Sequence, residues 1–227
     1  HRGTRSGVRL APMIPAMPAT IIGALGGMGG GGPAVTSQQS PAPKPAANDK
    51  AAAFVQTVLA STEDVWRAQM KGAGVQYRDP KLVLFRGYIQ SACGTGQSAM
   101  GPFYCPGDSK IYIDLNFFET MRTKLGSPGD FAYAYVVAHE VAHHVQNQLG
   151  ITGKVDAMRG RVSEAQMNQM SVRVELQADC LAGVWAHHSQ QAKGWLEQGD
   201  IEEAMNAASQ IGDDNMQRRG SGMVVPE

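Results

Sequence analysis

The residues best suited to catalytic chemistry form one short run, His139-Glu140-Val141-Ala142-His143. Residues four apart lie about 40° apart around a helix, so on a helix both imidazoles would project to one side, one turn apart. That geometry suits two ligands of one tetrahedral zinc ion. Glu140 would sit about 100° round from His139, near the metal without binding it, where it could take a proton from a zinc-bound water. The run therefore predicts the zinc site of a metallopeptidase, with Glu140 as the general base.

Two core histidines beside a buried glutamate are the alternative interpretation of this run. Its fillers and flanks are apolar except for His144, which predicts a buried helix. A buried carboxylate without a partner is costly, and a metal ion would supply that partner. This favours the zinc site over packing alone. His144 points about 100° away from His143, so we expect it to pack or to support a ligand, and not to bind metal.

A second pair of acidic residues, Glu175 and Asp179, is again spaced four apart and would share one helix face. A catalytic zinc takes three protein ligands and one water, so the third ligand must come from outside the first helix, and Glu175 fits. Asp179 is then placed to accept a hydrogen bond from the free N–H of a ligating imidazole, and His139 is the preferred donor. The alternative is two acidic residues on a solvated face. Apolar neighbours of the pair weigh against it: Val174, Leu176, Ala178, Cys180, Leu181, Val184 and Trp185.

Four helices and two short strands are expected to carry these residues. Hydrophobic periodicity and helix-start and helix-stop residues place the helices at about 48–70, 127–150, 160–187 and 200–211. Strand-like runs lie at 82–85 and 111–115. We therefore expect an α+β fold that is mostly helical. The helix with His139 should pack on a small antiparallel sheet, and the helix with Glu175 should run antiparallel to it.

The folded domain is expected to cover residues 48–212, between a Gly/Pro-rich tail at 1–47 and a polar C-terminal tail at 213–227. From Leu10 to Pro43 the chain carries no charged residue, which is long enough for a membrane span of about 20 residues. Prolines early in this stretch and glycines late in it interrupt its apolar character. A flexible tail and a degenerate membrane anchor both remain open.

Composition argues against a nucleic-acid partner. The chain has 227 residues, and its 20 Lys and Arg balance its 20 Asp and Glu to a formal charge of zero. It shows no basic stripe, and aromatic residues make up only 7% of it, which leaves few platforms on which bases could stack.

Cys93 and Cys105 flank a run rich in turn-forming residues that could close on itself. A disulfide across such a loop would contribute roughly 3 kcal/mol and would persist only in an oxidising compartment. Two unpaired buried thiols are the alternative. The remaining cysteine, Cys180, is expected to be a small buried hydrophobe.

Further residues could assist the reaction. Weaker candidates for a donor that stabilises an oxyanion are one of His187 and His188, and the tyrosines Tyr104 and Tyr112. The strand at 111–115 could lie at the edge of the cleft and pair with an extended peptide substrate.

Many separated segments resemble one family, the neutral zinc metallopeptidases of the bacterial envelope. The resemblance covers roughly residues 53–226. Its carriers are the segments 91–94, 101–106, 112–115, 129–131, 139–146, 175–185, 199–204 and 210–214.

The resemblance implies a zincin-like fold of the thermolysin-like superfamily, with one zinc ion on His139, His143 and Glu175 and with Glu140 as base. It also implies a short N-terminal membrane anchor and a domain on the periplasmic or other extracytoplasmic side of the bacterial envelope. An oxidising location of that kind favours the Cys93–Cys105 disulfide.

The expected function is therefore zinc-dependent hydrolysis of a peptide or protein substrate, and the sequence indicates no particular partner protein. A catalytically silent, zinc-stabilised envelope module for binding or assembly is the alternative. Members of the family usually continue past the position of Pro226 with a segment that contains a histidine, and this difference is what favours the alternative.

Overall fold

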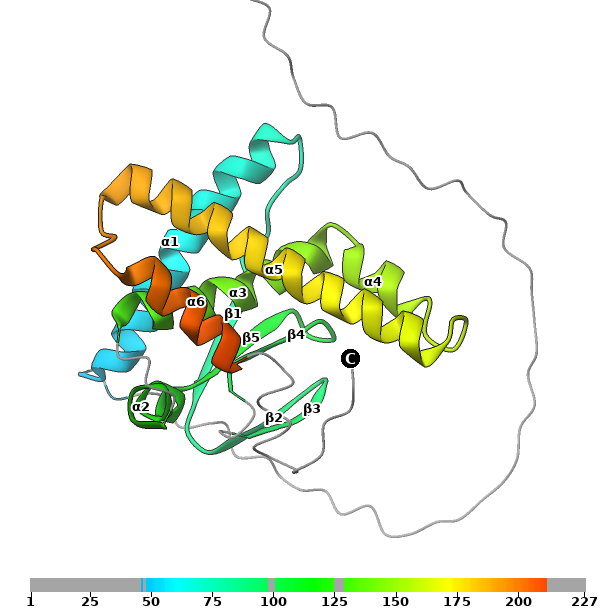
Figure 1. Ribbon diagram of the computed structural model, residues 1–227, viewed down its shortest axis with the longest axis horizontal. Coiled ribbons are helices and arrows are strands. Elements are labelled where there is room, and N and C mark those ends of the chain that lie inside the picture. The colour runs from blue at the N-terminus through cyan, green and yellow to red at the C-terminus, as the bar shows by residue number, and fades with distance from the viewer. Residues whose placement is uncertain (1–45, 47, 98–100, 125–128, 212–227) are drawn as a thin grey trace, which may run out of the picture. The chain divides into compact units, whose positions relative to one another are not determined.

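The computed structural model describes residues 46, 48–97, 101–124 and 129–211 (Figure 1). The predicted N-terminal tail with its candidate anchor, and the predicted C-terminal tail, lie outside these residues apart from Ala46. Helices in the described part are α1 Lys50–Gly72, α2 Leu115–Lys124, α3 Asp130–Gln148, α4 Ile151–Asp156, α5 Glu164–Lys193 and α6 Asp200–Ile211. Strands there are β1 Lys81–Phe85, β2 Tyr88–Ser91, β3 Gly94–Gln97, β4 Phe103–Cys105 and β5 Lys110–Asp114.

The mostly helical α+β class is confirmed by this order of elements. None of the helices described here combines the length and the apolar character that crossing a membrane requires.

The sheet beside the helices has three strands in the order β1-β5-β4, and β2 and β3 form a separate antiparallel hairpin. β4 pairs with β5 antiparallel, but β1 pairs with β5 in parallel, with Leu82 opposite Ile111. The predicted all-antiparallel sheet is therefore wrong. Residues 86–109 separate the two strands, which is long enough for the crossover that a parallel pair needs.

β5 is the central strand, so the prediction that residues 111–115 form the edge of a cleft is also wrong. Its residues Ile111 to Asp114 are all buried, although the alternating pattern predicted a half-buried strand. The Tyr112 hydroxyl donates to Asp108, and Asp114 accepts hydrogen bonds from the backbone N–H groups of Gly87 and Asn116. Both polar side chains thus have partners that allow burial.

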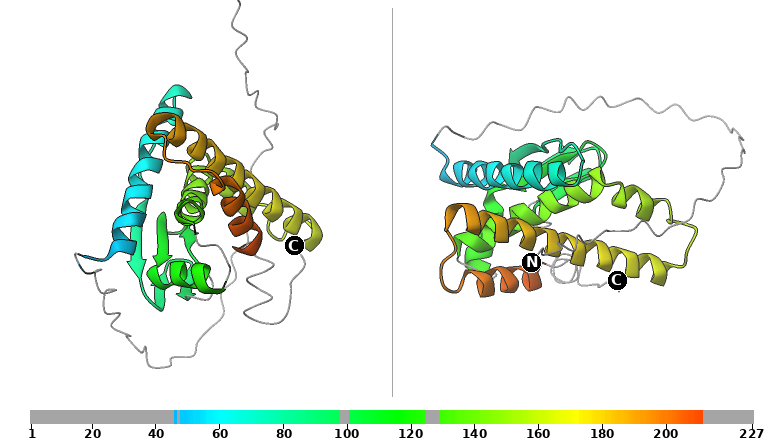
Figure 2. Two further views of the ribbon diagram at one scale, coloured as in Figure 1. Left: turned by 60° about the vertical axis from the view of Figure 1, so that its left-hand side comes forward. Right: turned by 90° about the horizontal axis from the view of Figure 1, so that it is seen from above.

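α3 lies in the middle of the described part, between α1 on one side and α5 with α6 on the other (Figure 2). It also contacts α4 and the strands β4 and β5. Its apolar residues are buried almost all round, as a helix without a polar face requires. This central position places the predicted zinc motif inside the protein and beside the sheet.

α5 packs along α3, and the start of one helix contacts the later part of the other. Phe131 near the start of α3 stacks on Trp185, whereas Gln146 near its end bonds to Val174. The two helices are therefore antiparallel along this contact, as expected. α5 begins with a capping box of Ser163 and Gln166, which satisfies two backbone donors at its start.

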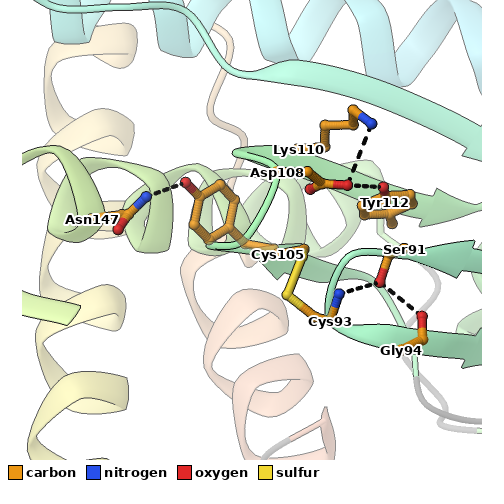
Figure 3. The surroundings of a disulfide bond; sticks show 9 residues. Ser91, Cys93, Gly94, Cys105, Asp108, Lys110, Tyr112 and Asn147 are labelled. Carbon is orange, nitrogen blue, oxygen red and sulfur yellow. Dashed lines mark hydrogen bonds and ion pairs between the residues drawn. A yellow bond between two sulfur atoms is a disulfide. The ribbon is translucent and has the colours of Figure 1, made fainter. Parts of the chain in front are cut away.

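The predicted disulfide between Cys93 and Cys105 is confirmed (Figure 3). It joins the turn between β2 and β3 to the last residue of β4, so it ties the hairpin to the end of that strand. Cys180, by contrast, is exposed on α5, and the prediction that it is buried is wrong.

Candidate metal centre

Three side chains converge between the two long helices: His139 and His143, one turn apart on α3, and Glu175 on α5. The Nε2 atoms of the histidines lie 3.1 Å apart. The Glu175 Oε2 atom lies 3.2 Å from His139 Nε2 and 3.3 Å from His143 Nε2. Ligand bonds of about 2.0–2.1 Å in a tetrahedral zinc site separate neighbouring ligand atoms by about 3.3 Å. The triangle therefore has the size that a zinc ion requires.

Within the described residues, no other group of three or more His, Cys, Asp or Glu side chains brings its potential ligand atoms together in this way. All three were expected as ligands from the sequence, and the structure brings them together.

Asp179 lies one turn after Glu175 and supports His139. Its Oδ1 atom is 3.0 Å from His139 Nδ1, and it also accepts a hydrogen bond from the hydroxyl of Tyr135. A carboxylate accepts, so His139 carries a hydrogen on Nδ1 and directs Nε2 at the other two ligands. Asp179 therefore contacts His139, the partner expected from the sequence, and Tyr135 is an additional contact that the sequence did not indicate.

Gln146 supports the second histidine and was also missed. Its Oε1 atom lies 2.9 Å from His143 Nδ1. The residue follows His143 by three positions on the same helix, a spacing at which helical side chains are neighbours. That spacing was the available signal. A glutamine is not a usual zinc ligand, so no ligand pattern pointed to it.

The charge balance of this centre favours a cation. Burial lowers the pKa of His139, but hydrogen bonds to Asp179 and Glu175 outweigh it and raise that pKa to about 10. Burial raises the pKa of Glu175, whereas its hydrogen bonds with His139 and His143 lower it to about 2. Without metal, a proton on the histidines therefore supplies the positive charge that the carboxylates attract. A divalent cation can take the place of that proton.

Glu140 is buried on α3 directly after His139. Burial raises the pKa of its carboxyl group, and the carboxylate accepts a hydrogen bond from the backbone N–H of Tyr104 on β4. The Tyr104 hydroxyl in turn accepts a hydrogen bond of 2.8 Å from Asn147 and lies 3.1 Å from His144 Nδ1. Strand β4 is thereby fixed to α3 at two points, one of them the predicted base.

His144 is a packed histidine, one of the two roles expected for it. It is buried, and its Nε2 atom lies 2.6 Å from the carbonyl oxygen of Arg78, which can only accept. Burial lowers its pKa, which favours the neutral ring. Within the described residues it does not belong to the metal-binding group.

The weaker candidates for an oxyanion donor are engaged elsewhere or exposed. The hydroxyl of Tyr104 bonds to α3, and that of Tyr112 lies 2.5 Å from Asp108 Oδ2 (Figure 3). His187 is exposed near the end of α5 and meets the ring of His188 edge-on.

Comparison with known proteins gives a family match over nearly the whole chain. A family described as "Putative neutral zinc metallopeptidase" matches residues 10–227. An Escherichia coli K12 protein, YpfJ, is 53% identical over 196 residues, which are 86% of this chain and 68% of that protein. A Mycobacterium tuberculosis H37Rv protein, Rv2575, is 42% identical over 177 residues, 74% of this chain and 57% of that protein. No solved structure matches the chain.

Proposed function

The chain belongs to the family described as "Putative neutral zinc metallopeptidase", and from this premise we propose that it hydrolyses peptide bonds with the help of one zinc ion. The observation that carries the proposal is the triangle of His139, His143 and Glu175 atoms, 3.1–3.3 Å on a side, next to a buried glutamate. His139, His143 and Glu175 would hold the ion, and Glu140 would be the base.

The ion would polarise the scissile carbonyl and lower the pKa of a water molecule to about 7. Glu140 accepts the proton of the attacking water and passes it to the leaving amine. Burial raises the pKa of the Glu140 carboxyl group, which favours its uptake of the proton. Asp179 keeps the hydrogen of His139 on Nδ1, so that Nε2 stays directed at the metal position.

The substrate should lie along β4. This strand is at an edge of the sheet, and the backbone N–H of Tyr104 points outward to Glu140 and not to β5. The outer edge of β4 therefore borders the base. An extended peptide that paired with this edge would have its backbone beside the carboxylate that must act on it. This replaces the expected role of the strand at 111–115.

A catalytically silent zinc module remains the alternative. A structural zinc is closed by four protein ligands, whereas a catalytic zinc has three and an open position. The three-residue group found in the described part of the chain supports the enzyme. The extracytoplasmic envelope location, with or without a membrane anchor, belongs to the same proposal. It is supported by the Cys93–Cys105 disulfide, which needs an oxidising compartment.

The test compares the zinc-loaded wild-type chain with Glu140→Gln on an unbiased peptide library. Glutamine keeps the shape of the side chain but cannot act as a base, so the variant should bind one zinc per chain and should lose cleavage by a factor of at least about 100. Cleavage by Glu140→Gln at the wild-type rate would refute the role of Glu140. Zinc bound by both proteins, with cleavage by neither, would favour the silent module.

A further inference from the structure

Gln146 is a polar side chain with no exposed surface, and it uses all of its hydrogen-bonding groups in the α3–α5 contact. Its Nε2 atom donates to the carbonyl oxygen of Val174 at 2.7 Å and to Oε1 of Gln177 at 3.0 Å. Its Oε1 atom lies 2.9 Å from His143 Nδ1. A buried amide without such partners would be strongly destabilising, so the arrangement is specific to this position.

The orientation of this amide follows from chemistry. A backbone carbonyl only accepts, so the group that faces Val174 must be the NH2 of Gln146, and the reverse orientation would put two oxygen atoms 2.7 Å apart. The oxygen of Gln146 therefore faces His143. Because that oxygen also only accepts, the hydrogen of the neutral His143 ring lies on Nδ1. His143 Nε2 is then free of hydrogen and directed at the other two candidate ligands.

The same amide also acts on the second helix. Val174 directly precedes Glu175, so the hydrogen bond from Gln146 holds the α5 backbone next to the third candidate ligand. Residues of α3 and α5 supply all three ligand atoms, and Gln146 connects the two helices at that level. One side chain thus orients a ring on α3 and holds the backbone beside a carboxylate on α5.

We propose that Gln146 is a positioning residue of the zinc site. It fixes the Nδ1–H form of His143 and ties the Glu175 turn of α5 to α3, which holds the three ligand atoms at their mutual distances. This proposal rests on the zinc site of the proposed function, and not on peptide cleavage. A carboxylate could accept a hydrogen bond from the His143 ring, and a lysine could donate one to the α5 backbone. An amide can do both at once.

The test uses two substitutions at Gln146 and one matched control. Gln146→Met has a similar volume and neither accepts nor donates strongly. Gln146→Glu keeps an acceptor for His143 and loses both donors to α5. Gln148→Met, on the same helix, removes an amide that bonds to the backbone of Arg78 at 2.9 and 2.8 Å and does not contact His143. Circular dichroism and thermal unfolding of each metal-free protein show whether it folds.

Zinc affinity, measured by competition with a chromophoric chelator, is the first readout. Partners of metal-ligating histidines change metal affinity about 10–100-fold when they are removed. We expect a loss in this range for Gln146→Met, a smaller but measurable loss for Gln146→Glu, and less than about a threefold change for Gln148→Met. Zinc binding by folded Gln146→Met as tight as that of the control would overturn the proposal.

Nitrogen-15 NMR of the zinc-loaded histidines is the second readout, and it separates positioning from general destabilisation. The Nδ1–H signal of His143 should be sharp and slow to exchange in the wild type and in Gln146→Glu. In Gln146→Met it should broaden or disappear. If Gln146→Met does not fold, Gln146→Glu still decides, because wild-type zinc affinity in that variant would refute the tie to α5. A wild-type chain that binds no zinc would refute the proposed function as well, whereas tight zinc binding that is unaffected at Gln146 would refute this proposal alone.

Discussion

Zinc binding by this chain should release protons, because the candidate ligand His139 holds one in the metal-free protein. Hydrogen bonds to Asp179 and Glu175 raise the pKa of His139 to about 10, although burial opposes them, so its ring is protonated in the metal-free protein at neutral pH. Glu175, with a pKa of about 2, is already ionised and releases none. Burial lowers the pKa of His143, but its hydrogen bond to Glu175 acts against burial, and the net effect is a raised pKa.

The expected release is therefore at least about one proton per zinc near pH 7, the one held by His139. Each displaced proton strengthens the apparent zinc affinity about tenfold for each unit of pH increase below the pKa of the group. From about pH 6 to about pH 9 the affinity should thus rise at least about a thousandfold.

Calorimetric zinc titrations in buffers with different heats of ionisation count the protons directly. Chelator competition at several pH values gives the slope of affinity against pH. Asp179→Asn is the matched variant, because it removes the carboxylate that raises the His139 pKa and leaves the three ligands in place. It should release fewer protons at about pH 8–9 than the wild type. Affinity that does not depend on pH, or release of less than about half a proton, would refute the assigned charge state of the cluster.

Three further predictions follow from named contacts. Tyr135→Phe removes the hydroxyl that bonds to Asp179, one step further from the metal, and should weaken zinc binding by no more than about tenfold in a chelator competition; a larger loss would mean that Tyr135 acts more directly. Replacing Cys93 and Cys105 by serine should lower the free energy of unfolding by about 3 kcal/mol in urea titrations, and an unchanged value would contradict a constraint on the unfolded chain. Because the folded-state pKa of His139 is raised, its contribution to the free energy of unfolding of the metal-free protein should be full below about pH 6.5 and should be lost as pH rises to about 10. In urea unfolding, Asp179→Asn should lose less stability over this pH range than the wild type. An equal loss in the two proteins would contradict the assignment to His139.

The candidate site was largely predictable because its main features are local. The spacing of His139, Glu140 and His143 on one helix fixes their relative directions whatever the rest of the fold does. The third ligand lies far away in the sequence. Glu175 could still be predicted, because a catalytic zinc usually has three protein ligands and the first helix supplies only two. Asp179 followed from the same helical spacing.

Features that depend on the packing of distant elements were missed or wrong. The strand at 82–85 pairs in parallel with β5 because of how residues 86–109 return, which no local pattern encodes. Cys180 was predicted to be a small buried hydrophobe, but it is exposed on α5, where Leu176 is also 62% exposed. Gln146 was missed because its role depends on the α5 backbone opposite it.

Dependence of peptide cleavage on zinc is best measured with a peptide library before and after the metal is removed. We expect the chain to bind one zinc, chelation to abolish cleavage, and one equivalent of zinc to restore it. Cleavage that persists at the same rate in the zinc-free protein would refute a zinc-dependent peptidase.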